Sequence, residues 1–196
     1  MGFGLLFIGY LFAFGFTSGA NYIVSIVGIV GSVFLFTASK KLSLYSTSFK
    51  VARYASGALG VSYTLNTVLQ LLQTYGIFAS DTIFLKVGRM LIIASVFFFN
   101  FLMYKGIADI AVNVGDKKLS VSAYRDLILM IVYYLFIGLS ATVSVHWAQY
   151  APILSFISTV LGLIWLVLSV WLVMSAYMRI CLPGDEDMPM KTRNGK

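Results

Sequence analysis

The chain has 196 residues, of which 60% are hydrophobic and only 11% are charged, and its mean hydropathy is +0.91. A soluble domain carries about twice that share of charged residues, so the composition excludes a water-soluble fold and indicates a protein embedded in lipid. The net charge is +7. Because the basic residues flank apolar stretches and form no face with stacking aromatics, we expect no nucleic-acid partner.

Six apolar stretches are each expected to cross the lipid bilayer as a helix, since about 20 mainly apolar residues span its hydrocarbon core. In chain order they are residues 2–17, 20–38, 54–75, 83–104, 127–145 and 152–177. The sequence therefore predicts an all-α, polytopic integral membrane bundle of six transmembrane helices. It forms one domain over residues 1–182, with a short cytoplasmic tail over 183–196.

The first stretch has a second interpretation, as a cleaved signal peptide. The run Ser18-Gly19-Ala20 resembles a small-residue cleavage site. However, no Lys or Arg precedes the apolar residues, and another apolar stretch follows at once. We therefore favour a membrane span over a signal peptide.

Twelve of the fourteen Lys and Arg residues lie in three places: segment 40–53, segment 105–125 and the chain from Arg179 onward. Six spans put all three on one side, which the positive-inside rule assigns to the cytoplasm together with both termini. The stretch 54–75 is polar enough to lie on the membrane surface instead. Without it, however, two basic loops would face opposite sides, so we expect it to span.

The layout is similar to that of many small multi-pass proteins of bacterial membranes, which implies a bacterial plasma membrane. A protein of the endoplasmic reticulum would follow the same charge rule.

Two stripes of polar residues run along the third and fourth predicted helices. The third helix carries Ser56, Tyr63, Asn66, Thr67, Gln70, Gln73 and Thr74 within an arc of about 100°. The fourth carries Lys86, Arg89, Asn100 and Tyr104 within about 60°. Such stripes either form hydrogen bonds between helices or line a cavity. If they face each other, Gln70 and Gln73 lie near Lys86 and Arg89, and Asn100 and Tyr104 lie near Ser56 and Tyr63.

Lys86 and Arg89 are the two basic residues outside the three clusters. They lie about 6 and 11 Å below the start of the fourth helix, so their long side chains can reach lipid headgroups. The alternative is an anion site close to a helix N-terminus, whose free N–H groups favour negative charge. The candidate binding site therefore comprises Lys86, Arg89, Gln70, Gln73, Asn66, Asn100, Tyr63 and Tyr104.

Catalysis and metal binding have little support. The lone Cys181 and lone His146 provide neither a disulfide nor a multi-ligand metal site, so we expect no cofactor and no metal. Ser140 and His146 fall on opposite faces of one helix, which excludes a serine nucleophile with a histidine base. No Asp or Glu lies inside the predicted spans, so a proton relay is not expected. His146 is expected beside Trp147 at the membrane interface, with an external pH sensor as the alternative.

Small residues indicate close helix packing at Gly28-x-x-x-Ser32 in the second helix and Ser158-x-x-x-Gly162 in the sixth. These faces could hold this bundle together, or bind a second copy or another membrane protein. We therefore expect a non-enzymatic accessory, regulatory or assembly subunit that acts through helix packing. The alternative is a small transporter or channel for an anionic solute, lined by the third and fourth helices.

Overall fold

The computed structural model describes residues 2–15, 22–76, 83–146 and 148–180. Within these residues the fold is all-α, as predicted, with six α-helices in chain order. They are α1 (Gly2–Tyr10), α2 (Tyr22–Leu42), α3 (Thr47–Thr74), α4 (Ile83–Val114), α5 (Lys117–His146) and α6 (Ala151–Arg179). Helix α1 continues into a π-helical turn, η1 (Leu11–Gly15), and a 3₁₀ turn, η2 (Ala148–Tyr150), precedes α6.

Local sequence explains how several helices begin. The hydroxyl of Ser46 caps α3 by accepting a hydrogen bond from the backbone N–H of Ser48 at 3.2 Å. Asp116 caps α5 in the same way, through the N–H of Leu119 at 3.1 Å. Pro152 lies in the first turn of α6, where its missing N–H costs no hydrogen bond. Gly115, between α4 and α5, has a φ of 84°, a conformation that favours glycine.

The predicted bounds of three helices are wrong at the basic end. Helix α3 begins seven residues before the predicted start at position 54, α4 continues ten residues past 104, and α5 begins ten residues before 127. The basic residues of segments 40–53 and 105–125 therefore lie on helical turns and not in loops. At 1.5 Å per residue, the 32 residues of α4 extend about 48 Å, well beyond a hydrocarbon core of about 30 Å.

Four helical segments are long and apolar enough to cross a membrane: Ser25–Leu42, Ile83–Val114, Lys117–Ser140 and Ala151–Arg179. Helix α1 with its π-helical extension is a shorter apolar segment, Gly2–Phe14. Helix α3 has the length to cross, but it is the more polar helix. The fold is therefore a helical bundle with four candidate membrane spans among the described residues, which indicates an integral membrane protein.

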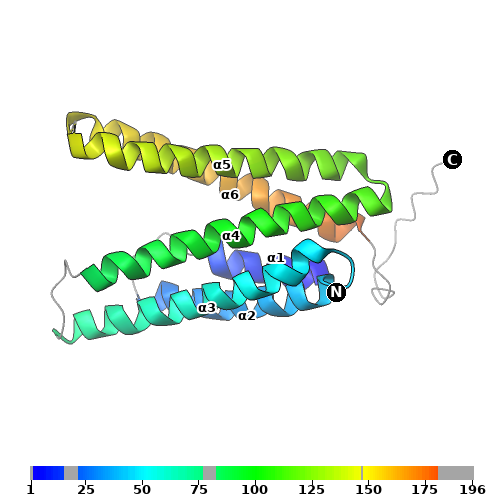
Figure 1. The fold of residues 1–196 in the computed structure, drawn as a ribbon, viewed down its shortest axis with the longest axis horizontal. Coiled ribbons are helices and arrows are strands. Elements are labelled where there is room, and N and C mark those ends of the chain that lie inside the picture. The colour runs from blue at the N-terminus through cyan, green and yellow to red at the C-terminus, as the bar shows by residue number, and fades with distance from the viewer. Residues whose placement is uncertain (1, 16–21, 77–82, 147, 181–196) are drawn as a thin grey trace.

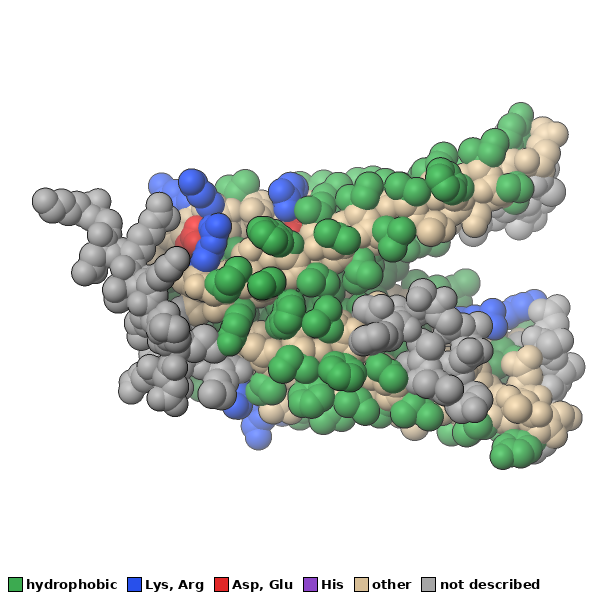
Figure 2. All heavy atoms as spheres, turned by 180° about the vertical axis from the view of Figure 1, so that it is seen from behind, with side chains coloured by type: hydrophobic (Ala, Val, Ile, Leu, Met, Phe, Trp, Pro, Cys, Tyr) green, Lys and Arg blue, Asp and Glu red, His purple; other side chains and the backbone are tan. Residues whose placement is uncertain are grey.

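The helices form two arms (Figure 1). Helices α2, α3 and α4 pack in sequence in one arm, and α5 and α6 form an antiparallel pair in the other. Helix α1 lies between the arms and contacts both α2 and α6. The arms meet at the end where the Lys and Arg side chains gather, here called the basic end, and they diverge toward the opposite end, leaving a crevice (Figures 1 and 2).

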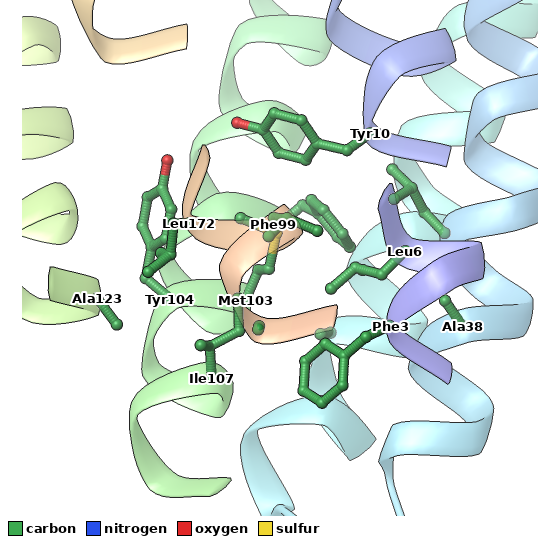
Figure 3. Close-up of a cluster of buried hydrophobic side chains, with 14 of the residues drawn as sticks. Phe3, Leu6, Tyr10, Ala38, Phe99, Met103, Tyr104, Ile107, Ala123 and Leu172 are labelled. Atoms are coloured by element: carbon green, nitrogen blue, oxygen red, sulfur yellow. The ribbon is translucent and has the colours of Figure 1, made fainter. Parts of the chain in front are cut away.

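The core lies where the two arms meet, near the basic end. Side chains from α1, α4 and α6 converge there, and each of the following is at most 1% exposed: Phe3, Leu6, Tyr10, Phe99, Met103, Tyr104, Ile107 and Leu172 (Figure 3). Aromatic rings fill much of this space, with Tyr10 packed edge-to-face on Phe14 at a centroid distance of 4.6 Å. Helix α1 thus lies between the arms and packs against both of them.

Candidate functional site

A buried polar cluster lies at the floor of the crevice. The hydroxyl of Tyr10 donates to Oδ1 of Asn100 at 2.9 Å. The indole Nε1 of Trp165 donates to the hydroxyl of Tyr104 at 2.8 Å, and that hydroxyl also shares a hydrogen bond with Ser169. All five side chains are buried and come from α1, α4 and α6. We call them the floor cluster.

Aromatic rings of α5 enclose the floor cluster. Tyr133 stacks on Trp165 with ring centroids 5.4 Å apart and an angle of 19° between the planes. Tyr134 packs edge-on against the same indole at 6.1 Å and against Phe97 of α4 at 5.1 Å. This shell keeps water away from the cluster. Because polar groups in a low-dielectric interior need protein partners, each hydrogen bond of the cluster contributes to stability.

The predicted stripe of α4 is therefore divided between two environments. Its members share one helical face, but Asn100 and Tyr104 are buried in the floor cluster, whereas Lys86 and Arg89 are exposed about three turns away. Asn100 and Tyr104 were predicted to lie near Ser56 and Tyr63, but they form no hydrogen bond with either residue. Their partners on other helices come from α1 and α6, and Nδ2 of Asn100 donates to the Val96 carbonyl of α4 itself.

Two members of the polar stripe of α3, Tyr63 and Asn66, make hydrogen bonds to other segments, as does Ser62 beside the stripe, while Ser56, Thr67 and Thr74 donate to carbonyls of α3 itself. The hydroxyl of Tyr63 donates to the backbone carbonyl of Ala13 at 2.8 Å, and Nδ2 of Asn66 donates to Ser25 of α2 at 3.0 Å. Ser62 and Ser95 share a hydrogen bond of 3.1 Å between α3 and α4. These contacts fit the interpretation of the stripe as interhelical hydrogen bonding.

Gln70 and Gln73, the remaining predicted site residues, are partly buried on the last turns of α3. Oε1 of Gln70 and Oδ1 of Asn66 are buried without a hydrogen-bond partner. Asn66 lies close to α4, because a Cβ added at Gly88 would be 3.7 Å from that Oδ1. The predicted site residues are thus brought to the same pair of helices, but they do not form one cluster.

Two acids lie on helical turns just beyond the ends of the predicted spans. Asp109 of α4 accepts hydrogen bonds from Ser46 at 3.1 Å and Ser48 at 3.0 Å, which ties α4 to the start of α3. Asp126 of α5 is fully buried, and its Oδ1 pairs with Arg125 at 2.8 Å. Both fall outside the predicted spans, because the predicted fourth span ends at 104 and the fifth begins at 127.

The other carboxylate oxygen of Asp126, Oδ2, is buried and has no hydrogen-bond partner. A charge in this position loses its hydration, and Arg125, its salt-bridge partner among the described residues, is half exposed. We expect Asp126→Asn, which keeps the shape and removes the charge, to raise the free energy of unfolding at neutral pH by about 1 kcal/mol. Thermal melting of the detergent-purified wild type and variant measures this. A lower melting temperature for Asp126→Asn would contradict the expectation.

The small-residue motifs serve contacts within the chain. A Cβ added at Gly28 would lie 2.8 Å from the ring of Tyr63, and the hydroxyl of Ser32 lies 2.7 Å from the Cβ position of Gly60. Gly162 packs beside Tyr133, while Ser158 bonds to the carbonyl of Ser155 in its own helix. Gly28, Ser32 and Gly162 therefore bring helices of this chain together, and a role in binding a partner remains a prediction.

Three residues singled out from the sequence, Trp147, Cys181 and the side chain of His146, lie outside the described part of the structure, as does the tail 183–196. Among the residues that are described, no three His, Cys, Asp or Glu side chains come together as metal ligands would. Comparison of the chain with protein-family models, with curated proteins and with solved structures gives no significant match.

Proposed function

We propose that this protein is a non-enzymatic, six-span integral membrane protein that acts as an accessory or assembly subunit, holding a transmembrane helix of a partner protein in the crevice between its arms. The observation that carries the proposal is the shape: the arms are joined at the basic end and splayed at the other end (Figures 1 and 2). In membranes, helices associate by close packing, so an unfilled interhelical crevice is a natural seat for another helix.

The outer half of α4 supports this proposal. Ile93 lies on the helical face of Asn100 and remains 44% exposed beyond the buried floor cluster. The floor of the crevice is closed, since Phe99, Asn100 and Tyr104 are all fully buried. A crevice that is closed below suits a helix inserted from the side better than a solute crossing the membrane.

The proposed orientation rests on charge. At the basic end, the described helices carry Lys40 and Lys41 on α2, Lys50 and Arg53 on α3, and Lys105, Lys117, Lys118, Arg125 and Arg179 on α4, α5 and α6. The positive-inside rule places this end, with the beginning of α1, in the cytoplasm. A crevice facing the other side of the membrane follows from that orientation.

A photoreactive amino acid in place of Ile93 tests the proposal in the native membrane. Ile93 shares the helical face of Arg89 and Asn100, so a probe there projects into the crevice. We expect a discrete adduct with one membrane protein. The control is the same probe at Val167, which is 65% exposed on α6, and only lipid adducts are expected there. Lipid adducts alone at both positions would contradict the proposal.

A second candidate function, transport of an anionic solute, is favoured by one observation. Lys86 and Arg89 are exposed on the same face of α4 that carries Asn100 and Tyr104 into the floor cluster. If this face lines a path, anion flux into proteoliposomes should be abolished by combining Lys86→Ala with Arg89→Ala. Unchanged flux in the double variant would remove these residues from any transport site.

A further inference from the structure

A groove runs along the outer surface between α2 and α3, separate from the crevice. Its volume is about 610 Å³. It is lined by Ile29, Ser32, Val33 and Phe36 of α2 and by Ser56, Gly57, Gly60, Val61, Thr64, Leu65 and Val68 of α3. Glycine creates much of the space, because a Cβ at Gly57 would have only Phe36 within 4 Å, at 3.9 Å.

The length of the groove matches one leaflet of a bilayer. From Ser56 to Val68 α3 rises about 18 Å, and half of a hydrocarbon core of about 30 Å is about 15 Å. The lining is predominantly apolar, with three hydroxyls from Ser32, Ser56 and Thr64. All three hydroxyls donate to carbonyls of their own helices. An acyl chain is the occupant that this narrow apolar channel fits.

Each helix carries a cation one turn beyond the groove, on the groove side. Lys40 follows Phe36 by four residues on α2, and Arg53 precedes Gly57 by four residues on α3, so each lies on the same helical face as the lining residue. Lys40 is exposed, whereas Arg53 is partly buried with its guanidinium 5.5 Å above the ring of Phe36. The groove thus ends in positive charge at the basic end of the molecule.

Arg53 also lacks an acceptor. Its Nε is buried and makes no hydrogen bond, and its contacts are with the rings of Phe36 and Tyr54. An unsatisfied buried donor is costly, and a guanidinium suits the paired oxygens of a phosphate. A phosphate group above the end of the groove would supply the missing acceptor.

We propose that the α2–α3 groove binds an anionic glycerophospholipid from the leaflet at the basic end, with one acyl chain along Gly57 and Gly60 and the headgroup phosphate on Arg53 and Lys40. The groove and the crevice lie on different pairs of helices, so this site is independent of the partner proposed above. Charge complementarity selects the lipid class: two cations frame the end of the groove, and no Asp or Glu is among its lining residues.

The test is native mass spectrometry of the full-length protein in detergent, titrated with phosphatidylglycerol or phosphatidylcholine. We expect the wild-type protein to bind phosphatidylglycerol more tightly than phosphatidylcholine. Arg53→Gln should weaken phosphatidylglycerol binding about tenfold and Lys40→Gln about fivefold, which reduces or removes the preference. Lys105→Gln, which removes an exposed cation of α4 far from the groove in sequence, should leave the preference unchanged. An equal loss in Lys105→Gln and Arg53→Gln would overturn the proposal, because it would indicate attraction to surface charge in general.

Filling the groove provides an independent test. Gly57→Leu should weaken binding of both lipids, whereas Gly138→Leu is the matched control, since no atom lies within 4 Å of the Cβ position of Gly138. Wild-type binding in Gly57→Leu would overturn the proposal. Inorganic phosphate should leave the melting temperature unchanged; stabilisation equal to that by phosphatidylglycerol would assign the site to free phosphate and also overturn it. Lys40 is exposed, so its variant tests the headgroup site even if a groove variant folds poorly.

Discussion

Replacing Gly31 with leucine should detach α1 from α2 and lower the free energy of unfolding by about 3 kcal/mol or more. At Gly31 a Cβ would lie 2.4 Å from the backbone N of Ala13 and 2.8 Å from its Cα. Backbone atoms cannot rotate away as the end of a side chain can, so the whole π-helical turn would have to move. Gly9 of α1 also packs closely on α2, because a Cβ there would lie 2.8 Å from the backbone N of Leu35.

Thermal melting and size-exclusion chromatography of the detergent-purified variants measure the effect. Gly31→Ala should cost about 2 kcal/mol, because the gain in helix propensity of about 1 kcal/mol offsets part of the overpacking. The control is again Gly138→Leu, which adds the same side chain to an open position on α5 and should melt as the wild type does. A wild-type melting temperature for Gly31→Leu would show that α1 does not cross α2 at this point.

The two predicted helices that meet at Gly31 illustrate what hydropathy can reveal. Apolar runs identify both as candidate spans, because each would be insoluble if exposed to water. The π-helical turn Leu11–Gly15 could not be predicted, since it depends on where the backbone of Ala13 meets Gly31 and on the hydroxyl of Tyr63 that reaches the Ala13 carbonyl. These are contacts between residues far apart in the chain.

Helix bounds failed for a different reason. The predicted fourth span ended at Tyr104 because Lys105 marks the edge of the apolar run, and hydropathy reports contact with lipid. Helix α4 nevertheless continues to Val114, since no residue from 105 to 114 is a proline and the first positive φ after the start of α4 is at Gly115. Because the predicted fourth span ends at 104 and the predicted fifth begins at 127, the sequence does not predict that Asp109 and Asp126 are helical.

The candidate site was predicted only in part. Helical periodicity correctly placed Asn100 and Tyr104 on one face, because that follows from 100° per residue. Their partners Tyr10 and Trp165 were missed, although one signal existed: Tyr10 carries the only polar side chain of α1, and a hydroxyl in an apolar helix must find a partner. The identity of the partner still required the three-dimensional arrangement of the helices.

Removing one hydroxyl from the floor cluster, by Tyr104→Phe, should lower the free energy of unfolding by about 2 kcal/mol. Interhelical hydrogen bonds in membrane proteins average about 0.6 kcal/mol, but a buried donor left without an acceptor costs about 1–3 kcal/mol. The larger figure applies because Trp165 is only 8% exposed and donates to this hydroxyl alone. Tyr75→Phe, at a tyrosine that is 78% exposed, is the control and should leave stability unchanged.

A double-mutant cycle distinguishes the hydrogen bond from packing. Trp165→Phe removes the donor, so adding Tyr104→Phe to it leaves no indole N–H unsatisfied, and the second change should cost about 1 kcal/mol less than it does alone. Ser169 retains its bond to the carbonyl of Trp165 at 2.6 Å in either background. If the two costs simply add, the hydroxyl of Tyr104 does not hold α4 to α6, and the closure of the crevice floor must come from the packing of Tyr133 and Phe99 around it.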